Sequence, residues 1–205
     1  MLDEVNKKDI DVNKLVKRAI TNQNFFSELL NGLTSKNDII RFNCHKILTK
    51  ISEENPKQLY SKWNYLEDLL KSTNNYHKLI AIELIANLTK VDVENKFDAI
   101  FETYYSILNS EKTMVAGHLA GVSGKISKNK PKLQNKITKK LLNIDNTHQG
   151  KQVELIKAYI IDAFSEYFKE AENKEEIKRF IKQQITSKSP KTSKKARDFL
   201  KTHSI

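Results

Sequence analysis

The sequence predicts an all-α fold, an α-α superhelix (solenoid) in which helical hairpins stack one after another. Only 5 glycines and 3 prolines occur among 205 residues, whereas a sheet protein of this length needs many turns, which use these two residues. Apolar residues recur at the three- and four-residue spacing of a helix face. This apolar pattern itself repeats about every 38 residues, and such a period is typical of helical-repeat arrays.

The repeat is clearest where one short segment recurs. Residues 51–57, Ile-Ser-Glu-Glu-Asn-Pro-Lys, reappear 75 positions later as Ile-Ser-Lys-Asn-Lys-Pro-Lys at residues 126–132. The offset corresponds to two periods. The helices that precede these segments align in four columns at spacings of four, three and four residues, which describe one helix face. The columns are Ile40/His77/Val115, Cys44/Ala81/Leu119, Ile47/Leu84/Val122 and Ile51/Leu88/Ile126.

Two further copies follow in the C-terminal half. The last covers residues 189–200, and the fourth, over 153–168, allows two registers. Keeping the period places Ala158 in the second column but brings Glu154 and Ser165 onto the apolar face. We favour the other register, which keeps the face apolar and requires a longer connection before the helix. Its inward residues are Ile156, Ile160, Ala163 and Tyr167.

Helix start signals and short connections divide the chain into about eleven helices. We expect residues 1–21 to form an N-terminal capping helix and residues 22–205 to form about five antiparallel hairpins of about 38 residues. All belong to a single repeat domain over 1–205, since each repeat buries its core only against its neighbours. The predicted helices span 9–21, 23–34, 37–53, 56–71, 74–91, 93–109, 111–128, 131–143, 149–170, 174–186 and 189–203.

The second helix of each hairpin resembles the pattern of the HEAT-repeat family. In that pattern a loop ending in Asp or Pro leads to a basic residue, then to a small residue three positions later, then to a leucine. Asp38, Arg41, Cys44 and Leu48 match it best, whereas the third copy has Ala116 in place of the basic residue. The resemblance implies a scaffold that binds its partners on the concave face formed by the second helices. Armadillo-like and irregular α-α superhelices share much of this pattern and stay open as alternatives.

We therefore predict a non-enzymatic scaffold, a protein-protein interaction module that uses this concave face. Its partner is expected to be another protein. The second helices supply the contact residues, and those of the first two copies include Arg41, His45, Lys78 and Glu83.

The net charge of +11 favours an alternative partner, a nucleic acid. Residues 1–110 carry 15 basic and 15 acidic residues, so the excess of lysine lies in the C-terminal half. Basic surfaces bind phosphate backbones largely through counterion release, although a lysine-rich surface that only keeps the chain in solution explains the charge equally simply. The candidate basic patches contain Lys125, Lys128 and Lys130, and then Lys194, Lys195 and Arg197.

Residue patterns typical of enzymes have simpler structural explanations here. No segment matches the glycine-rich phosphate-binding loops, and Gly117, Gly121 and Gly124 fall inside an amphipathic helix, where close helix packing explains them. Cys44 lies in an apolar column and is predicted to be a buried structural thiol. No two of the five histidines are four residues apart, so no helical metal pair is formed. We predict no catalytic residue, no cofactor and no metal.

Trp63 bears on one remote enzyme alternative. HEAT-like DNA glycosylases use tryptophan and an aspartate on a concave basic surface. The single tryptophan of this chain falls on a predicted first (convex) helix, in an apolar stripe with Leu59, Leu66 and Leu70. A role in the core is therefore favoured over one in base recognition.

The sequence also bears on the compartment. No apolar run approaches the ~20 residues that span a bilayer, and the N-terminus is too polar for a secretory signal peptide. The single cysteine fits a reducing compartment. We expect a cytoplasmic protein with no membrane partner; the pattern does not predict an oligomeric state.

Overall fold

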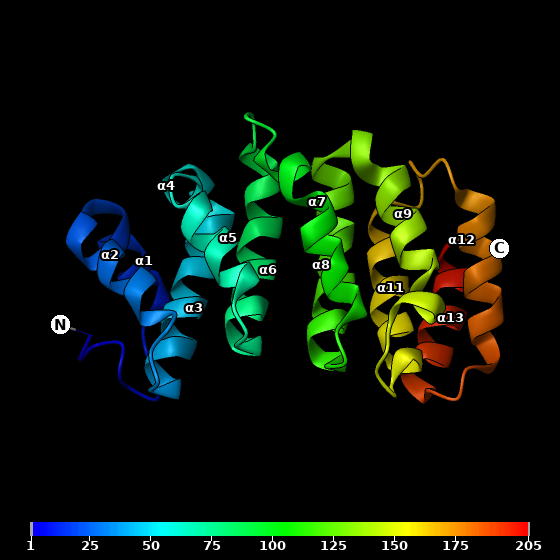
Figure 1. Ribbon diagram of the computed structural model, residues 1–205, viewed down its shortest axis with the longest axis horizontal. Helices are drawn as coiled ribbons and strands as arrows, with labels where there is room; N and C mark the ends of the chain where they lie inside the picture. Colours follow the sequence, from blue (N-terminus) through cyan, green and yellow to red (C-terminus); the bar gives the residue numbers. More distant parts are fainter. Residues whose placement is uncertain (1, 205) are drawn as a thin grey trace. The chain divides into compact units, whose positions relative to one another are not determined.

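The computed structural model describes residues 2–204, and within them all regular structure is helical (Figure 1). It confirms the all-α, helical-repeat fold that the sequence predicts. The chain divides into two compact units. Unit 1 comprises Met1–Glu94 and unit 2 comprises Asn95–Ile205. Within residues 2–204, no helix combines the length and the apolar character needed to cross a membrane.

Unit 1 consists of hairpins whose second helices are α3 and α6. Helices α1 and α2 pack on α3, α3 packs on α4 and α6, and α5 packs on α6. The first helix therefore packs on the first hairpin, and its role as a cap stays a prediction. The elements are α1 (Val12–Thr21), α2 (Gln23–Gly32), α3 (Asp38–Glu54), α4 (Pro56–Tyr60), α5 (Trp63–Lys71), α6 (Asn75–Leu88) and the 3-10 turn η1 (Thr89–Val91).

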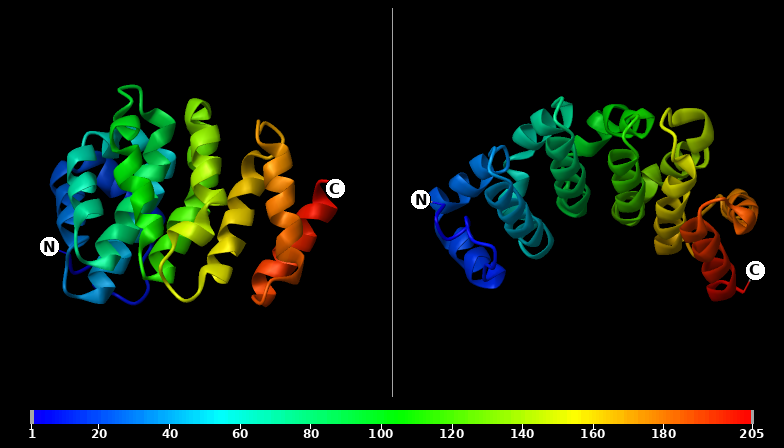
Figure 2. Two further views of the ribbon diagram at one scale, coloured as in Figure 1. Left: turned by 45° about the vertical axis from the view of Figure 1, so that its right-hand side comes forward. Right: turned by 90° about the horizontal axis from the view of Figure 1, so that it is seen from below.

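Unit 2 continues the same hairpin pattern. Its second helices are α8, α11 and α13; α11 packs against both of the others, and α12 packs against α13 (Figure 2). The elements are α7 (Lys96–Ser106), η2 (Ile107–Asn109), α8 (Thr113–Asn129), η3 (Pro131–Leu133), α9 (Gln134–Leu142), α10 (Ile144–Thr147), α11 (Val153–Tyr167), α12 (Lys174–Gln183), η4 (Gln184–Thr186) and α13 (Pro190–Thr202).

The helix boundaries differ from the predicted ones in two places. The predicted helix over 56–71 is interrupted at Ser61 and Lys62, which separate α4 from α5. The connection before the fourth copy carries the short helix α10, so that α11 starts at Val153, later than predicted. The favoured register of the fourth copy is confirmed. Its four inward residues, Ile156, Ile160, Ala163 and Tyr167, are fully buried.

The N-terminal residues before α1 form no helix but are held against α3. Asn43, itself buried, donates from Nδ2 to the carbonyl oxygens of Val5 and Lys7, at 2.8 Å each. The side chain of Val5 is fully buried, and Asn37 at the start of α3 donates to the Asn6 side chain at 3.1 Å. Because a buried amide left without acceptors is costly, these bonds fix the segment in place.

Close packing of α8 on α11 explains two of the three glycines of α8. A Cβ added at Gly117 lies 3.1 Å from the ring of Tyr159, and one at Gly124 lies 2.7 Å from the carbonyl oxygen of Ala163. At Gly121 the nearest atom, again of Tyr159, is 3.7 Å away. The helix-packing role predicted for this glycine run is therefore confirmed at Gly124, where a backbone oxygen leaves no room for a Cβ, and at Gly117, where a Cβ would be tight against Tyr159.

Candidate protein-interaction surface

Large apolar side chains are exposed on the two second helices of unit 1. Phe42 on α3 is 65% exposed, Tyr76 on α6 is 54% exposed and Ile39 on α3 is 45% exposed. Ile39 and Phe42 are three residues apart and so share one side of their helix. Since single exposed apolar residues are ordinary but a group of them is informative, these residues mark a candidate contact surface. Together with Arg41 they are called the α3–α6 patch.

Arg41 links the two helices of the patch. Its guanidinium lies over the Tyr76 ring, with 4.7 Å between Cζ and the ring centroid. The same side chain donates from Nη1 to the Ser35 carbonyl at 2.8 Å and pairs with Asp38. Only 12% of it is exposed. Arg41 therefore supports the exposed ring of Tyr76 rather than projecting a free charge, and the patch is mainly apolar.

The other residues predicted at this surface lie beside the patch. His45 of α3 approaches Glu83 of α6 at 3.2 Å, and both side chains are about a quarter exposed. His77 contacts Ser72 through Nδ1 at 3.0 Å; burial and then the nearby Arg41 charge lower the pKa of His77, which favours its neutral form. Lys78 is half-buried. The structure thus brings Arg41, His45 and Glu83 together on α3 and α6.

The predicted apolar columns describe the buried helix face, so they do not point to these exposed apolar residues. Ile39, Tyr76 and Met114 occupy one column of the repeat, directly before the column Ile40/His77/Val115. Met114, in unit 2, is 57% exposed. A helix turns about 100° per residue, so this column falls off the buried face. The sequence therefore does contain a signal for this surface. It is a repeat column of three large apolar residues that does not face the core.

The first basic patch is largely paired. Lys130 is 11% exposed, and its Nζ lies 3.1 Å from Asn95 Oδ1 and 3.4 Å from Asp98 Oδ2. Lys128 is exposed and Lys125 is half-buried. Burial raises the pKa of Glu166 on α11. The charges of Lys128 and Lys125 lower it by less, so this pKa stays above its ordinary value.

The second basic patch also meets acidic residues of α11. Lys195 pairs with Asp162 of α11, and Arg197 donates to the Ile185 carbonyl at 3.3 Å. Lys194 is exposed. Because α11 packs against both α8 and α13, its carboxylates Asp162 and Glu166 are set among the lysines of the two patches. The two patches therefore do not merge into one uninterrupted basic surface.

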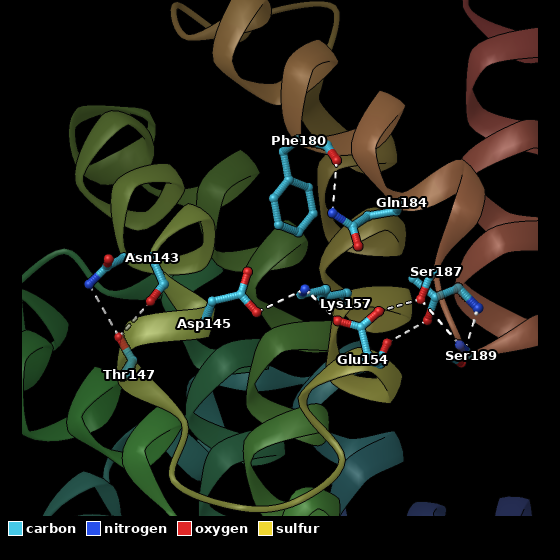
Figure 3. A network of polar contacts seen from close by, with 10 residues as sticks. Asn143, Asp145, Thr147, Glu154, Lys157, Phe180, Gln184, Ser187 and Ser189 are labelled. Atoms are coloured by element: carbon cyan, nitrogen blue, oxygen red, sulfur yellow. Dashed lines mark hydrogen bonds and ion pairs between the residues drawn. The ribbon is translucent and has the colours of Figure 1, made fainter.

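Unit 2 also contains a buried polar network with a structural role (Figure 3). Lys157 of α11, only 8% exposed, lies 2.8 Å from Asp145 of α10 and 2.6 Å from Glu154. Burial alone raises the pKa of Glu154, but hydrogen bonds from Lys157 and Ser187 hold it below its ordinary value. Thr192 of α13 donates to the Glu154 carbonyl. The charge of Lys157 is paired with both carboxylates, and the network joins α10, α11 and α13. It presents no reactive group.

Trp63 and Cys44, the residues considered for a chemical role, lie in the core. Trp63 is 2% exposed and the three leucines of its stripe, Leu59, Leu66 and Leu70, are buried, so the ring is not available to a nucleic-acid base. Cys44 is fully buried, and burial raises the pKa of its thiol to about 12. The structural role predicted for Cys44 is confirmed. Among residues 2–204, no three His, Cys, Asp or Glu side chains are grouped to hold a metal ion.

Solved structures of the helical-repeat class resemble this chain. A designed armadillo repeat protein superposes with a TM-score of 0.60 at 13% identity, covering 98% of this chain and 97% of its own. An engineered protein superposes with a TM-score of 0.53 at 15% identity, covering 93% of this chain and 87% of its own. No protein-family model and no curated protein matches the sequence. The similarity supports an α-α solenoid; it does not distinguish the HEAT type from the armadillo type.

Proposed function

We propose that the chain is a non-catalytic scaffold that binds another protein through the α3–α6 patch. The observation that carries the proposal is the exposure of two aromatic rings, Phe42 and Tyr76, on neighbouring second helices. Aromatic side chains dominate the energy of many protein interfaces because they bury a large area while ordering few torsions. Arg41 holds Tyr76 in place before binding, which reduces the entropy lost when a partner docks.

The proposal is tested with a double variant, Phe42→Ser with Tyr76→Ser, in affinity capture from the source cells. The matched control is Val93→Ser, because Val93 is 85% exposed and lies outside the patch in the same unit. We expect at least one protein to be captured by the wild type and by the control, and to be depleted at least tenfold with the double variant. A protein set that is identical for all three baits contradicts this use of the patch.

A second candidate function, nucleic-acid binding, is favoured by the charge distribution alone. Unit 2 carries 22 of the 36 basic residues and 12 of the 25 acidic ones. Its test is fluorescence anisotropy of labelled DNA and RNA at roughly 50 and 200 mM salt. Binding that falls steeply with salt and weakens on Lys194→Glu with Lys195→Glu supports it. Absence of binding at the lower salt removes it.

We further infer the HEAT type within the helical-repeat class, and a cytoplasmic location. Arg41 supports the HEAT assignment because this basic residue, at the position the family pattern requires, bonds to Ser35 in the loop before α3 and to Asp38 at the helix start. The single, fully buried cysteine supports a reducing compartment. Imaging of a fluorescent fusion in the source cells tests the location.

A further inference from the structure

A pocket of about 470 Å³ lies at the C-terminal end of unit 2. Its volume falls within the range of small-molecule binding sites. Three segments form it: the residues that follow α11, one side of α12, and the end of α13. Its lining residues are Phe168, Lys169, Lys174, Lys178, Thr202, His203 and Ser204.

The lining concentrates positive charge. Three of the seven residues are lysines and none is acidic. Lys174 and Lys178 are one turn apart on α12, and Lys174 is the first residue of that helix, where the helix dipole disfavours a cation. Lys178 also donates to Glu175 at 2.7 Å, but Glu175 is 79% exposed, and pairs of this kind contribute little. The three lysines therefore give the pocket a positively charged lining that suits an anion.

Aromatic rings and hydroxyl groups complete the pocket. The His203 ring lies 4.8 Å from the ring of Phe168 and 4.3 Å from the ring of Phe199. Burial and then the charge of Lys169 lower the pKa of His203, so the imidazole is favoured in its neutral form beside the lysines. Thr202 and Ser204 add hydroxyl groups, which donate hydrogen bonds to oxygen anions. The lining thus combines ammonium groups, neutral donors and the imidazole ring of His203.

We propose that this pocket binds a small molecule that carries a phosphate or polyphosphate group. Three ammonium groups match the charge of a diphosphate or triphosphate, and lysine binds phosphate as a compact point charge. The ring of His203, which is partly exposed, provides a surface for an attached planar group. This site lies outside the α3–α6 patch, in the other unit, so the proposal is independent of the protein-binding function.

The test is isothermal titration calorimetry of the full chain with inorganic pyrophosphate, ATP and adenosine at about 50 mM salt, where exposed charges are only partly screened. We expect pyrophosphate and ATP to bind and adenosine not to bind. The pocket variant, Lys169→Gln with Lys174→Gln, should bind both anions roughly tenfold more weakly, or worse, because each lost ammonium removes a charge-assisted bond. Circular dichroism establishes that the variants remain folded.

The matched control is Lys132→Gln with Lys139→Gln, which removes the same charge from exposed positions outside the pocket. Its affinity for ATP should stay within about twofold of the wild type, since long-range attraction is screened over about 10 Å. Equal weakening in both variants, or no binding of either anion to the wild type, overturns the proposal. A single-stranded oligonucleotide that binds where ATP and pyrophosphate do not also overturns it, because the phosphate then comes from a polymer.

Discussion

The guanidinium of Arg41 lies over the exposed ring of Tyr76, with 4.7 Å between Cζ and the ring centroid. One side chain thereby performs two tasks. It closes the loop before α3 through the Ser35 carbonyl and Asp38, and it orients an aromatic ring of the neighbouring hairpin. Arg41, which the sequence predicts as a contact residue, is itself only 12% exposed and lies against an exposed ring.

This relationship predicts a measurable coupling between the two residues. In a double-mutant cycle of Arg41→Ala and Tyr76→Ala, we expect a coupling free energy of about 0.5–1 kcal/mol, as for a partly exposed cation–π pair. Arg41→Ala alone should cost about 1–2 kcal/mol, since the hydrogen bond to Ser35 is lost as well. Urea unfolding measures both quantities. Strictly additive effects of the two substitutions would show that the ring and the guanidinium do not interact.

The glycines of α8 predict opposite effects for two similar substitutions. Gly124→Ala should lower the free energy of unfolding by about 1–3 kcal/mol, because its Cβ meets the Ala163 backbone at 2.7 Å and the Glu166 side chain at 2.8 Å. Gly121→Ala has room at 3.7 Å and should be neutral or stabilising by up to about 1 kcal/mol, since alanine favours the helix. Urea titration of both variants decides; equal effects would mean that α8 and α11 are not packed this closely.

The buried thiol of Cys44 should be unreactive in the folded protein. With its pKa raised to about 12, the thiolate fraction at pH 8 is on the order of 10⁻⁴, and the sulfur is fully buried. We expect a disulfide reagent to modify the thiol in strong denaturant but not in native buffer. Rapid native modification at pH 8 is the contrary outcome.

The same raised pKa predicts how stability depends on pH. A group whose pKa is higher in the folded state stabilises fully below its ordinary pKa, which is 9.0 for this thiol, and that contribution declines as pH rises toward about 12. Between about pH 9 and 10, the free energy of unfolding should fall by up to about 1.4 kcal/mol per pH unit. Cys44→Ala should flatten this slope and cost less than about 2 kcal/mol at pH 7. An unchanged slope in the variant would exclude Cys44 as its source.

The single domain that the sequence predicts can be tested with the one tryptophan. Trp63 is buried in unit 1, so its fluorescence reports that unit, whereas far-UV circular dichroism reports helices of both units. We expect the two urea transitions to coincide, as for a cooperative single domain. Transitions with separate midpoints would show that the two units unfold independently.

The helices and their buried faces could be predicted because burial follows the helical period. The columns of Cys44 and Ile51 are buried in every aligned copy, and the fourth copy is buried in the register that kept its face apolar. The interruption at Ser61 and Lys62 carries neither proline nor glycine, so no local signal marked it. Pairings such as that of Lys130 with Asp98, 32 residues away, depend on how hairpins pack and have no counterpart in a linear pattern.

Only part of the candidate site could be predicted. The repeat columns identified α3 and α6 and the residues Arg41 and His45. They did not identify Phe42 and Tyr76, because neither residue falls in one of the apolar columns. Arg41 bonds to Ser35, pairs with Asp38 and lies over the ring of Tyr76. These contacts depend on the loop geometry before α3, which the sequence pattern does not contain.

The anchoring of Val5 and Lys7 by Asn43 has a practical consequence for anyone who shortens this chain. Residues 2–10 look like a dispensable polar leader, since they form no helix and are rich in charge. Removing them would leave a buried amide without acceptors and uncover the cavity that Val5 fills. In hydrogen exchange, protection is expected at the amides of Val5 and Asn6, which donate to the Leu2 carbonyl at 2.9 Å. A boundary drawn at the first helix would therefore cut through the core.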